Sequence, residues 1–222
     1  MRAGNRRWIL PAMLALICAG ILPAEGFISY TEGQVTVRRS GSELNGEIGL
    51  NLREGDRVMT DSDSLAVLEL TDRGTLKLRE DSELVLGSLE DEVSVSLARG
   101  GLFSRIRQLT GRGYHVETPN VVAAVRGTEF FVAYGRTIDD APDLWLCVNE
   151  GAVEVALEDS GETVTVNEGE GINILSGNRL TDPKFFPWTQ ELNWNSDPAA
   201  GEVRDSTDLD GAYADLRNFD YD

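Results

Sequence analysis

Short runs in which apolar and polar residues alternate, each ending near a glycine, occupy residues 27–180. In such a run every second side chain falls on one face of an extended strand, so that one face is apolar. The alternating pairs include Val35 and Val37, Leu68 and Leu70, Leu76 and Leu78, Val93 and Val95, Val153 and Val155, and Ile172 and Ile174. The glycines separate these runs at about the 8–12-residue spacing that is typical of sandwiches, barrels and rolls.

The pattern therefore predicts an all-β fold with many short strands and glycine turns. A short helix or turn is expected only near residues 103–109. Two compact architectures remain open, a sandwich-like fold and a short solenoid-like roll, while the lack of a repeat of fixed length disfavours a long regular solenoid.

The first 26 residues have the pattern of an export signal. Three arginines precede an apolar run over residues 8–22, and small residues follow it. Because about 20 helical residues are needed to cross a bilayer, the run favours a cleaved signal peptide, with cleavage after Ala24 or Gly26, over a retained anchor. The sequence predicts a periplasmic or extracellular protein whose mature chain has no membrane span, although an uncleaved leader would leave it tethered.

Beyond residue 180 the alternation stops and the chain becomes acidic. Residues 181–198 contain four large aromatic side chains, which we expect to pack on the β-core, with docking on a partner as the alternative. Residues 199–222 have too few apolar groups to offset the entropy of ordering, and we expect them to form a mobile acidic tail. The four aromatic residues are Phe185, Phe186, Trp188 and Trp194.

Charge and cysteine content narrow the functional classes. The chain carries 20 basic and 38 acidic residues, a formal net charge of −18. A surface of this sign repels nucleic acid and anionic lipid, so nucleic acid is not an expected partner. Removal of the leader would leave Cys147 as the one cysteine, inside the apolar run 144–148, where a buried thiol without a disulfide is expected.

No local pattern predicts catalysis or a metal. His115 is the one histidine and has no neighbouring triad residues, so a hydrolytic site would have to assemble around it in three dimensions. No cluster of Cys and His suits zinc. The acidic turn at residues 208–211 lacks the final glutamate of a calcium loop. We therefore predict neither a cofactor nor an enzyme.

The most individual stretch lies between residues 114 and 132. It contains Thr118-Pro119, which should end one strand, and Arg126-Gly127-Thr128-Glu129, which should turn the chain into the next. An arginine buried between strands needs acceptors, such as backbone carbonyls, Glu129 or Glu150. We favour a structural lock over a ligand-binding role for this motif.

Several segments of the chain resemble the FecR-type periplasmic domain. They are residues 33–37 (GQVTV), 52–60 (LREGDRVMT), 64–78 with Asp72 and Gly74, 116–119 (VETP), 125–130 (VRGTEF) and 148–153 (VNEGAV). The resemblance covers residues 33–171, and one departure is Arg73, which lengthens the turn between Asp72 and Gly74. FecR regulators also carry a cytoplasmic segment that contacts a sigma factor, and only seven residues precede the apolar run here.

The resemblance implies a stand-alone module of the cell envelope that binds other proteins, without the part that acts on transcription. We therefore expect a non-catalytic protein-interaction or scaffold protein whose partners are envelope proteins. Two alternatives stay open: a periplasmic hydrolase or ligand-binding enzyme built around His115, and a membrane-tethered sensor that keeps its leader.

Overall fold

A computed structural model describes residues 26–89, 92–107, 113–137, 142–175, 178–209 and 211. It contains eighteen strands and one 3-10 turn, η1 (Pro187–Thr189), so the predicted all-β class with many short strands is confirmed. The predicted export signal lies outside the described residues except for Gly26, which is the first residue of β1. Within the described part of the chain, no helix has the length and apolar character that a bilayer crossing requires.

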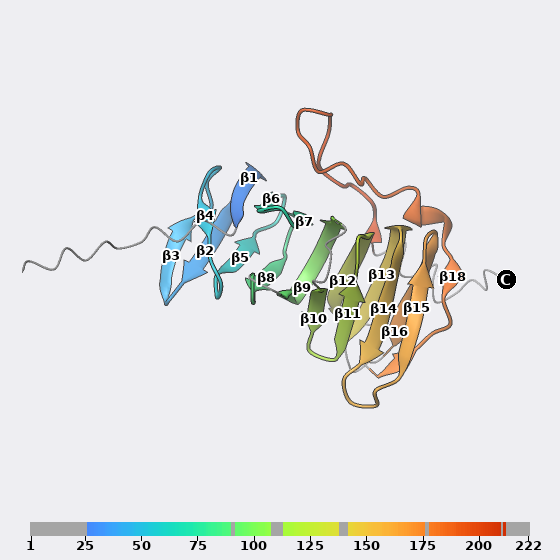
Figure 1. Cartoon of the computed structure of the whole chain (residues 1–222). Helices are drawn as coiled ribbons and strands as arrows, with labels where there is room; N and C mark the ends of the chain where they lie inside the picture. The colour runs from blue at the N-terminus through green and yellow to red at the C-terminus, as the bar shows by residue number, and fades with distance from the viewer. Residues whose placement is uncertain are drawn as a thin grey trace, which may run out of the picture.

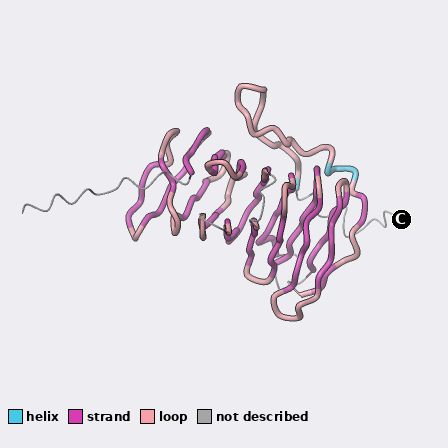
Figure 2. The backbone as a smooth tube through the Cα atoms, viewed as in Figure 1, coloured by secondary structure: helices cyan, strands magenta, loops and turns pink. Residues whose placement is uncertain are grey.

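The strands form two layers, which we call sheet A and sheet B. Sheet A runs in the order β4 (Asn51–Leu52), β1 (Gly26–Glu32), β6 (Leu65–Leu70), β7 (Gly74–Leu78), β9 (Val93–Ile106), β12 (Glu129–Thr137), β13 (Pro142–Glu150) and β16 (Glu170–Leu175), with β17 (Arg179–Leu180) and β18 (Lys184–Phe185) both beside β16. Figures 1 and 2 show the strands as an elongated row.

Sheet B runs in the order β3 (Ser42–Asn45), β2 (Val35–Arg39), β5 (Arg57–Thr60), β8 (Glu83–Leu86), β9, β10 (Tyr114–Thr118), β11 (Val121–Val125), β14 (Ala152–Leu157) and β15 (Thr163–Asn167). Neighbouring strands are antiparallel in both sheets, apart from the parallel pair β9 and β10. Figure 1 places β3 and β15 at opposite ends of this layer.

Strand β9 belongs to both layers. Its first half, up to Arg99, pairs with β8 and β10 in sheet B, and its second half, from Gly100, pairs with β7 and β12 in sheet A. The change of layer occurs at Gly100, which has φ +93°, and a Cβ there would lie 2.5 Å from the Ser82 Cα. The short helix or turn expected near residues 103–109 is therefore wrong where the structure describes it, because residues 103–106 continue the strand.

The main core fills the space between the two sheets. The alternating apolar residues of the sequence pattern lie in this cluster, including Val37, Leu68, Leu76, Val95 and Val155. A second and a third cluster lie on the outer face of sheet A, where strands β6, β9, β12 and β13 are apolar on both faces. The outer face of sheet A is therefore built to be covered rather than solvated.

The cover is the segment that begins with η1, and we refer to residues 187–209 as the C-terminal strap. It crosses the outer face of sheet A (Figure 1), where Leu192 and Leu209 join the second cluster and Val203 joins the third. The sequence placed the end of the packed region at residue 198 and a mobile tail beyond it. In the structure residues 203–209 still pack on the sheet, because buried cations beneath them bind their carbonyl and carboxylate oxygens.

Candidate functional site

Lys77 is the centre of the contact between sheet A and the strap. On β7 it falls between Leu76 and Leu78, which face the main core, so its side chain points to the outer face. There it is 2% exposed. Its Nζ donates hydrogen bonds to the carbonyl oxygens of Asn193, Asn195 and Val203, at 2.5, 2.8 and 3.1 Å.

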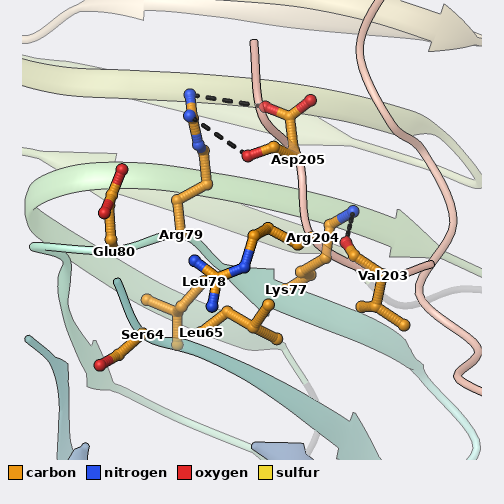
Figure 3. A pocket seen from close by; sticks show the side chains of 9 residues that line it. All are labelled: Ser64, Leu65, Lys77, Leu78, Arg79, Glu80, Val203, Arg204 and Asp205. Carbon is orange, nitrogen blue, oxygen red and sulfur yellow. Dashed lines mark hydrogen bonds and ion pairs between the residues drawn. The ribbon is translucent and has the colours of Figure 1, made fainter. Parts of the chain in front are cut away.

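A buried ammonium needs three acceptors, and the strap supplies all three from its main chain. Figure 3 shows Lys77 reaching the Val203 carbonyl. Burial lowers the pKa of Lys77 to about 8, and the negative charge of Asp205 opposes this shift. The ammonium therefore carries its charge at neutral pH at the expense of hydration, and the three carbonyl contacts offset part of that cost.

Arg79 extends the contact along the strap. Its Nη2 donates to the Thr207 carbonyl at 3.0 Å, and its Nη1 lies 3.5 Å from the Asp205 carboxylate, which is almost fully buried (Figure 3). Burial lowers the pKa of Arg79, and Asp205 opposes this effect. Further out, Arg204 of the strap binds Glu32 at 2.8 Å and the Asp63 carbonyl at 2.8 Å. Residues 203–207 are thus bound to β7 and the residue after it through Lys77 and Arg79, and to β1 through Glu32.

An aromatic floor lies beside these cations. Phe103 contacts Phe131 at 4.5 Å between ring centroids and meets the edge of Trp194 at 5.3 Å. Trp194 comes from the strap, and its Nε1 donates to the Thr189 carbonyl at 2.7 Å. Cys147 lies in the same cluster, fully buried as the apolar run predicts, and burial raises the pKa of its thiol to about 12.

The strap also holds its own shape through asparagine side chains. The Asn193 amide donates to the carbonyls of Glu202 and Arg204, both at 2.9 Å, and the Asn195 amide donates to Glu202 at 3.0 Å. The Asn193 N–H donates to the Asp205 carboxylate at 2.9 Å. These bonds close a loop from 193 to 205 whose two arms both reach Lys77.

Two cavities adjoin the strap. The first, a small cavity of about 20 Å³, lies between β6, β7 and residues 203–205, and Figure 3 labels its lining. The second is an open cleft of about 290 Å³ where β9 changes layer, bordered by Arg79, Arg99, Tyr134 and Leu209. Burial raises the pKa of Tyr134. Among the residues that the structure describes, no group of His, Cys, Asp and Glu side chains could hold a metal ion.

The motif singled out between residues 118 and 129 lies at the ends of β10, β11 and β12. Thr118 is buried and donates to the Val121 carbonyl at 3.3 Å, while Pro119 is exposed in the following turn. Thr128 is buried and donates to the Ala152 carbonyl at 2.9 Å. Gly127 has φ +68°, a conformation that suits glycine.

The structure corrects the expected clamp of Arg126. Arg126 is exposed rather than enclosed between strands. Glu129 is buried, and its partners are Arg105, whose Nε donates at 2.6 Å, and Asn149, whose Nδ2 donates at 2.6 Å. The reason is the register: Glu129 lies opposite Arg105 in the β9–β12 ladder, so Arg105 reaches the carboxylate directly.

His115 contacts Glu92, with Nε2 at 2.7 Å from the carboxylate. The Glu92 side chain is 67% exposed, and neither of the two cavities beside the strap includes His115 in its lining. Ser94 lies opposite His115 in the parallel ladder, but its hydroxyl accepts the Ser88 N–H at 3.1 Å. The pair has the geometry of a surface hydrogen bond.

The four aromatic residues have different surroundings. Phe186 is buried, Trp194 is half-buried against the floor, and Phe185 is 55% exposed. The side chain of Trp188 lies outside what the structure describes. The expected packing therefore applies to two of these residues, and the exposed Phe185 ring lies over Gly169.

Sequence reasoning missed Lys77, Arg79 and Asp205. Lys77 alternates with two core leucines, a pattern that ordinarily indicates a solvated lysine. The signal that could have found the site is the pair of uninterrupted apolar runs at residues 130–133 and 144–148. Such runs indicate a sheet buried on both faces, and a buried face needs a covering segment.

Comparison with known proteins agrees with the resemblance seen in the sequence. Residues 56–154 match the family model described as FecR protein, from β5 into β14. The resemblance to the FecR domain is thereby confirmed for these residues. Among curated proteins, none matches the chain.

Two crystal structures from Parabacteroides distasonis, each of a protein assigned provisionally as an anti-sigma factor, have a similar fold. The first, at 1.65 Å resolution, has a TM-score of 0.50 at 17% identity over 58% of this chain and 59% of that one. The second, at 2.50 Å, has a TM-score of 0.52 at 17% identity over 72% of each chain. The chain thus spans about three fifths of the length of the first neighbour, and the likeness concerns the fold.

Proposed function

We propose that this chain is an exported, non-catalytic module of the cell envelope that binds other proteins. The observation that carries the proposal is the outer face of sheet A, where Lys77 and Arg79 bind backbone carbonyls above an aromatic floor. This is the chemistry of holding an extended polypeptide. In this structure the polypeptide is the chain's own strap.

The family match supports the same conclusion. Residues 56–154 match the FecR protein family, and the provisional assignment of the structural neighbours as anti-sigma factors agrees with a regulatory or interaction role. The buried cations of this face, Lys77 and Arg79, contact strap carbonyls and the Asp205 carboxylate. Their role in the structure is to bind the strap. The hydrolase alternative would need a nucleophile beside His115, and the nearest hydroxyl in register, that of Ser94, is bonded to Ser88.

Export and compartment are part of the proposal. The leader-like pattern of residues 1–26 supports secretion into the periplasm or beyond, with envelope proteins as the partners. Amino-terminal sequencing of the protein purified from its native envelope tests this directly. A start near Glu25 or Phe27 supports a released protein, and an intact leader would favour the membrane-tethered sensor.

The binding role is tested by photo-crosslinking in intact cells. A photoreactive amino acid replaces Thr165 at the β15 end, Ile48 at the opposite end or Phe185, all three of which are exposed. We expect a discrete adduct with one envelope protein from at least one position. Absence of adducts at all three, together with a hydrolytic activity that His115→Ala abolishes, would overturn the proposal in favour of the enzyme.

A further inference from the structure

Strand β15 is an edge of sheet B, and among the described residues some of its backbone hydrogen-bonding groups are unused. Its one ladder among the described strands is with β14, in register from Ala152 opposite Asn167 to Ala156 opposite Thr163. The Leu157 N–H donates to the Glu162 carbonyl at 2.9 Å, so by antiparallel alternation Val164 and Val166 also face β14. Thr163 and Thr165 then direct their N–H and C=O groups away from the sheet.

The other outermost strands are protected in ways that β15 is not. Strand β4 and the pair β17 and β18 contain two residues each, too short to guide a further strand. Strand β3 carries Glu43, which pairs with Arg38 at 2.7 Å. Strand β15 has five residues, of sequence TVTVN, without a charge, a proline or a shift of register. Four of these five are β-branched, which favours further pairing.

The charges around β15 define what could pair with it. Glu154 lies opposite Thr165 on β14 and is exposed, as are Glu158, Asp159, Glu162 and Glu168 near the two ends of the strand. The sequence has no lysine or arginine from 137 to 178. A second copy of the chain would bring the same acidic groups to the contact, and like charges placed directly opposite destabilise a sheet. An approaching basic strand would gain instead.

We propose that the β15 edge binds an extended, lysine- or arginine-bearing segment of a partner protein, which adds one strand to sheet B. The inference rests on the proposed binding function and names the surface and the partner's chemistry. The main-chain groups of Thr163 and Thr165 give the pairing, and the surrounding carboxylates select basic side chains. The strap and its buried cations take no part, since they lie on the outer face of the other sheet.

The test uses the full chain and a labelled ten-residue peptide of alternating lysine and valine, with binding followed by fluorescence anisotropy. Thr165→Pro removes one outward N–H without removing a bond to β14. Glu43→Pro is the matched control, because Glu43 has the same outward position on β3: the Gly46 N–H donates to the Val35 carbonyl, so the alternation turns residue 43 outward. Circular dichroism confirms that both variants fold.

We expect Thr165→Pro to weaken peptide binding by about 10-fold or more, and Glu43→Pro to leave it unchanged. Glu154→Gln with Glu162→Gln should weaken binding and flatten its salt dependence. A peptide N-methylated on alternate residues should not bind. This peptide arm keeps the test decisive even if Thr165→Pro does not fold.

Three results would overturn the inference. They are equal binding of a glutamate–valine peptide, no effect of either the proline variant or N-methylation, and a dimer of the chain that Thr165→Pro dissolves. The last would assign the edge to a second copy. If the cells still give a crosslinked partner from Ile48 or Phe185 while β15 fails these tests, the binding function stands and the β15 edge is excluded as its surface.

Discussion

The Lys77 ammonium lies 4.2 Å from the centroid of the Phe103 ring and at the same time donates to three carbonyls of the strap. One side chain thus joins the aromatic floor of sheet A to residues 193, 195 and 203. A cation over a ring face is attracted by the ring's quadrupole, and the attraction is stronger where water is excluded. The strap is therefore tied to the sheet at a buried point.

Replacement of Lys77 by methionine should destabilise the protein at neutral pH by about 1–3 kcal/mol, because three carbonyls lose their donor. The pH dependence is more specific. The unfolded chain keeps the Lys77 proton to about pH 10.5, whereas the folded chain releases it near pH 8. The unfolded state thus binds more protons between these values, and the Lys77 contribution to stability rises with pH over that window.

Urea unfolding of the natural chain and Lys77→Met at pH 7.5 and pH 10 measures this contribution. The natural chain should gain stability relative to the variant at the higher pH. Groups whose folded pKa is raised, such as Tyr114, act equally in both proteins and cancel in the difference. A difference that stays constant or shrinks would show that Lys77 is not desolvated as described.

Cys147 should report whether the strap is closed. Its thiol lies beneath the strap and its pKa is raised to about 12, so it should resist alkylation in the folded protein. Asp205→Asn keeps an oxygen acceptor for Asn193 and Thr207 but removes the charge that faces Arg79. The experiment uses residues 27–222, in which Cys147 is the one cysteine. We expect Asp205→Asn to make alkylation of Cys147 about 10-fold faster, which is equivalent to about 1.4 kcal/mol.

Asp197→Asn serves as the control for this experiment, since Asp197 is exposed and bonds the Ala199 N–H within the strap. Its labelling rate should match that of the natural chain. Equal acceleration in both variants would mean that the loss of any acidic charge, rather than the contact with Arg79, opens the strap.

Gly100→Ala should cost about 3 kcal/mol or more, because the new Cβ adds a close approach to the Ser82 Cα to the strain of a positive φ. Gly41→Ala separates the two effects. Gly41 has φ +83° with nothing within 4 Å of its Cβ position, so its loss should be about 1 kcal/mol. Thermal unfolding of both variants measures the difference, and equal losses would show that the approach to Ser82 adds no cost at Gly100.

Gly127→Val should prevent folding, because a β-branched residue strains at φ +68° where β11 turns into β12. Arg126→Ala, the adjacent change, should alter stability by less than about 0.5 kcal/mol, since Arg126 is exposed. Circular dichroism distinguishes the two variants. A native β spectrum and an unchanged melting point for Gly127→Val would show that the turn tolerates a side chain.

The alternation of apolar residues was enough to predict the strands and the core between the sheets. Val35, Leu76 and Val155 all lie in that core. The expectation of a short helix near residues 103–109 failed because Gly100 and Gly101 interrupt the alternation of β9, although β9 continues through both as one strand. The alternation of apolar residues indicates which face of a strand is buried. Because β9 passes from sheet B to sheet A at Gly100, the buried face changes there and the alternation is interrupted.

The strap could not be predicted in the same way. Val203 and Leu209 are isolated apolar residues in an acidic segment, so they form no period, and composition alone favours disorder. Their order depends on partners more than a hundred residues away, such as Lys77. The burial of Lys77 could not be predicted either. A lysine between two core leucines has the same sequence pattern whether its side chain is solvated or covered by a strap.

The path of β9 also determines how the molecule bears load. Among the described strands, every ladder that links β1–β8 to β10–β18 includes β9, with β7 and β12 in one layer and β8 and β10 in the other. Tension applied between the two ends of the row is therefore carried within the sheets by β9 alone, and outside them by the strap, which binds Lys77, Arg79 and Glu32. Once the strap has been pulled off the outer face, the two halves should part at β9 in a single rupture, instead of unzipping strand by strand from either end.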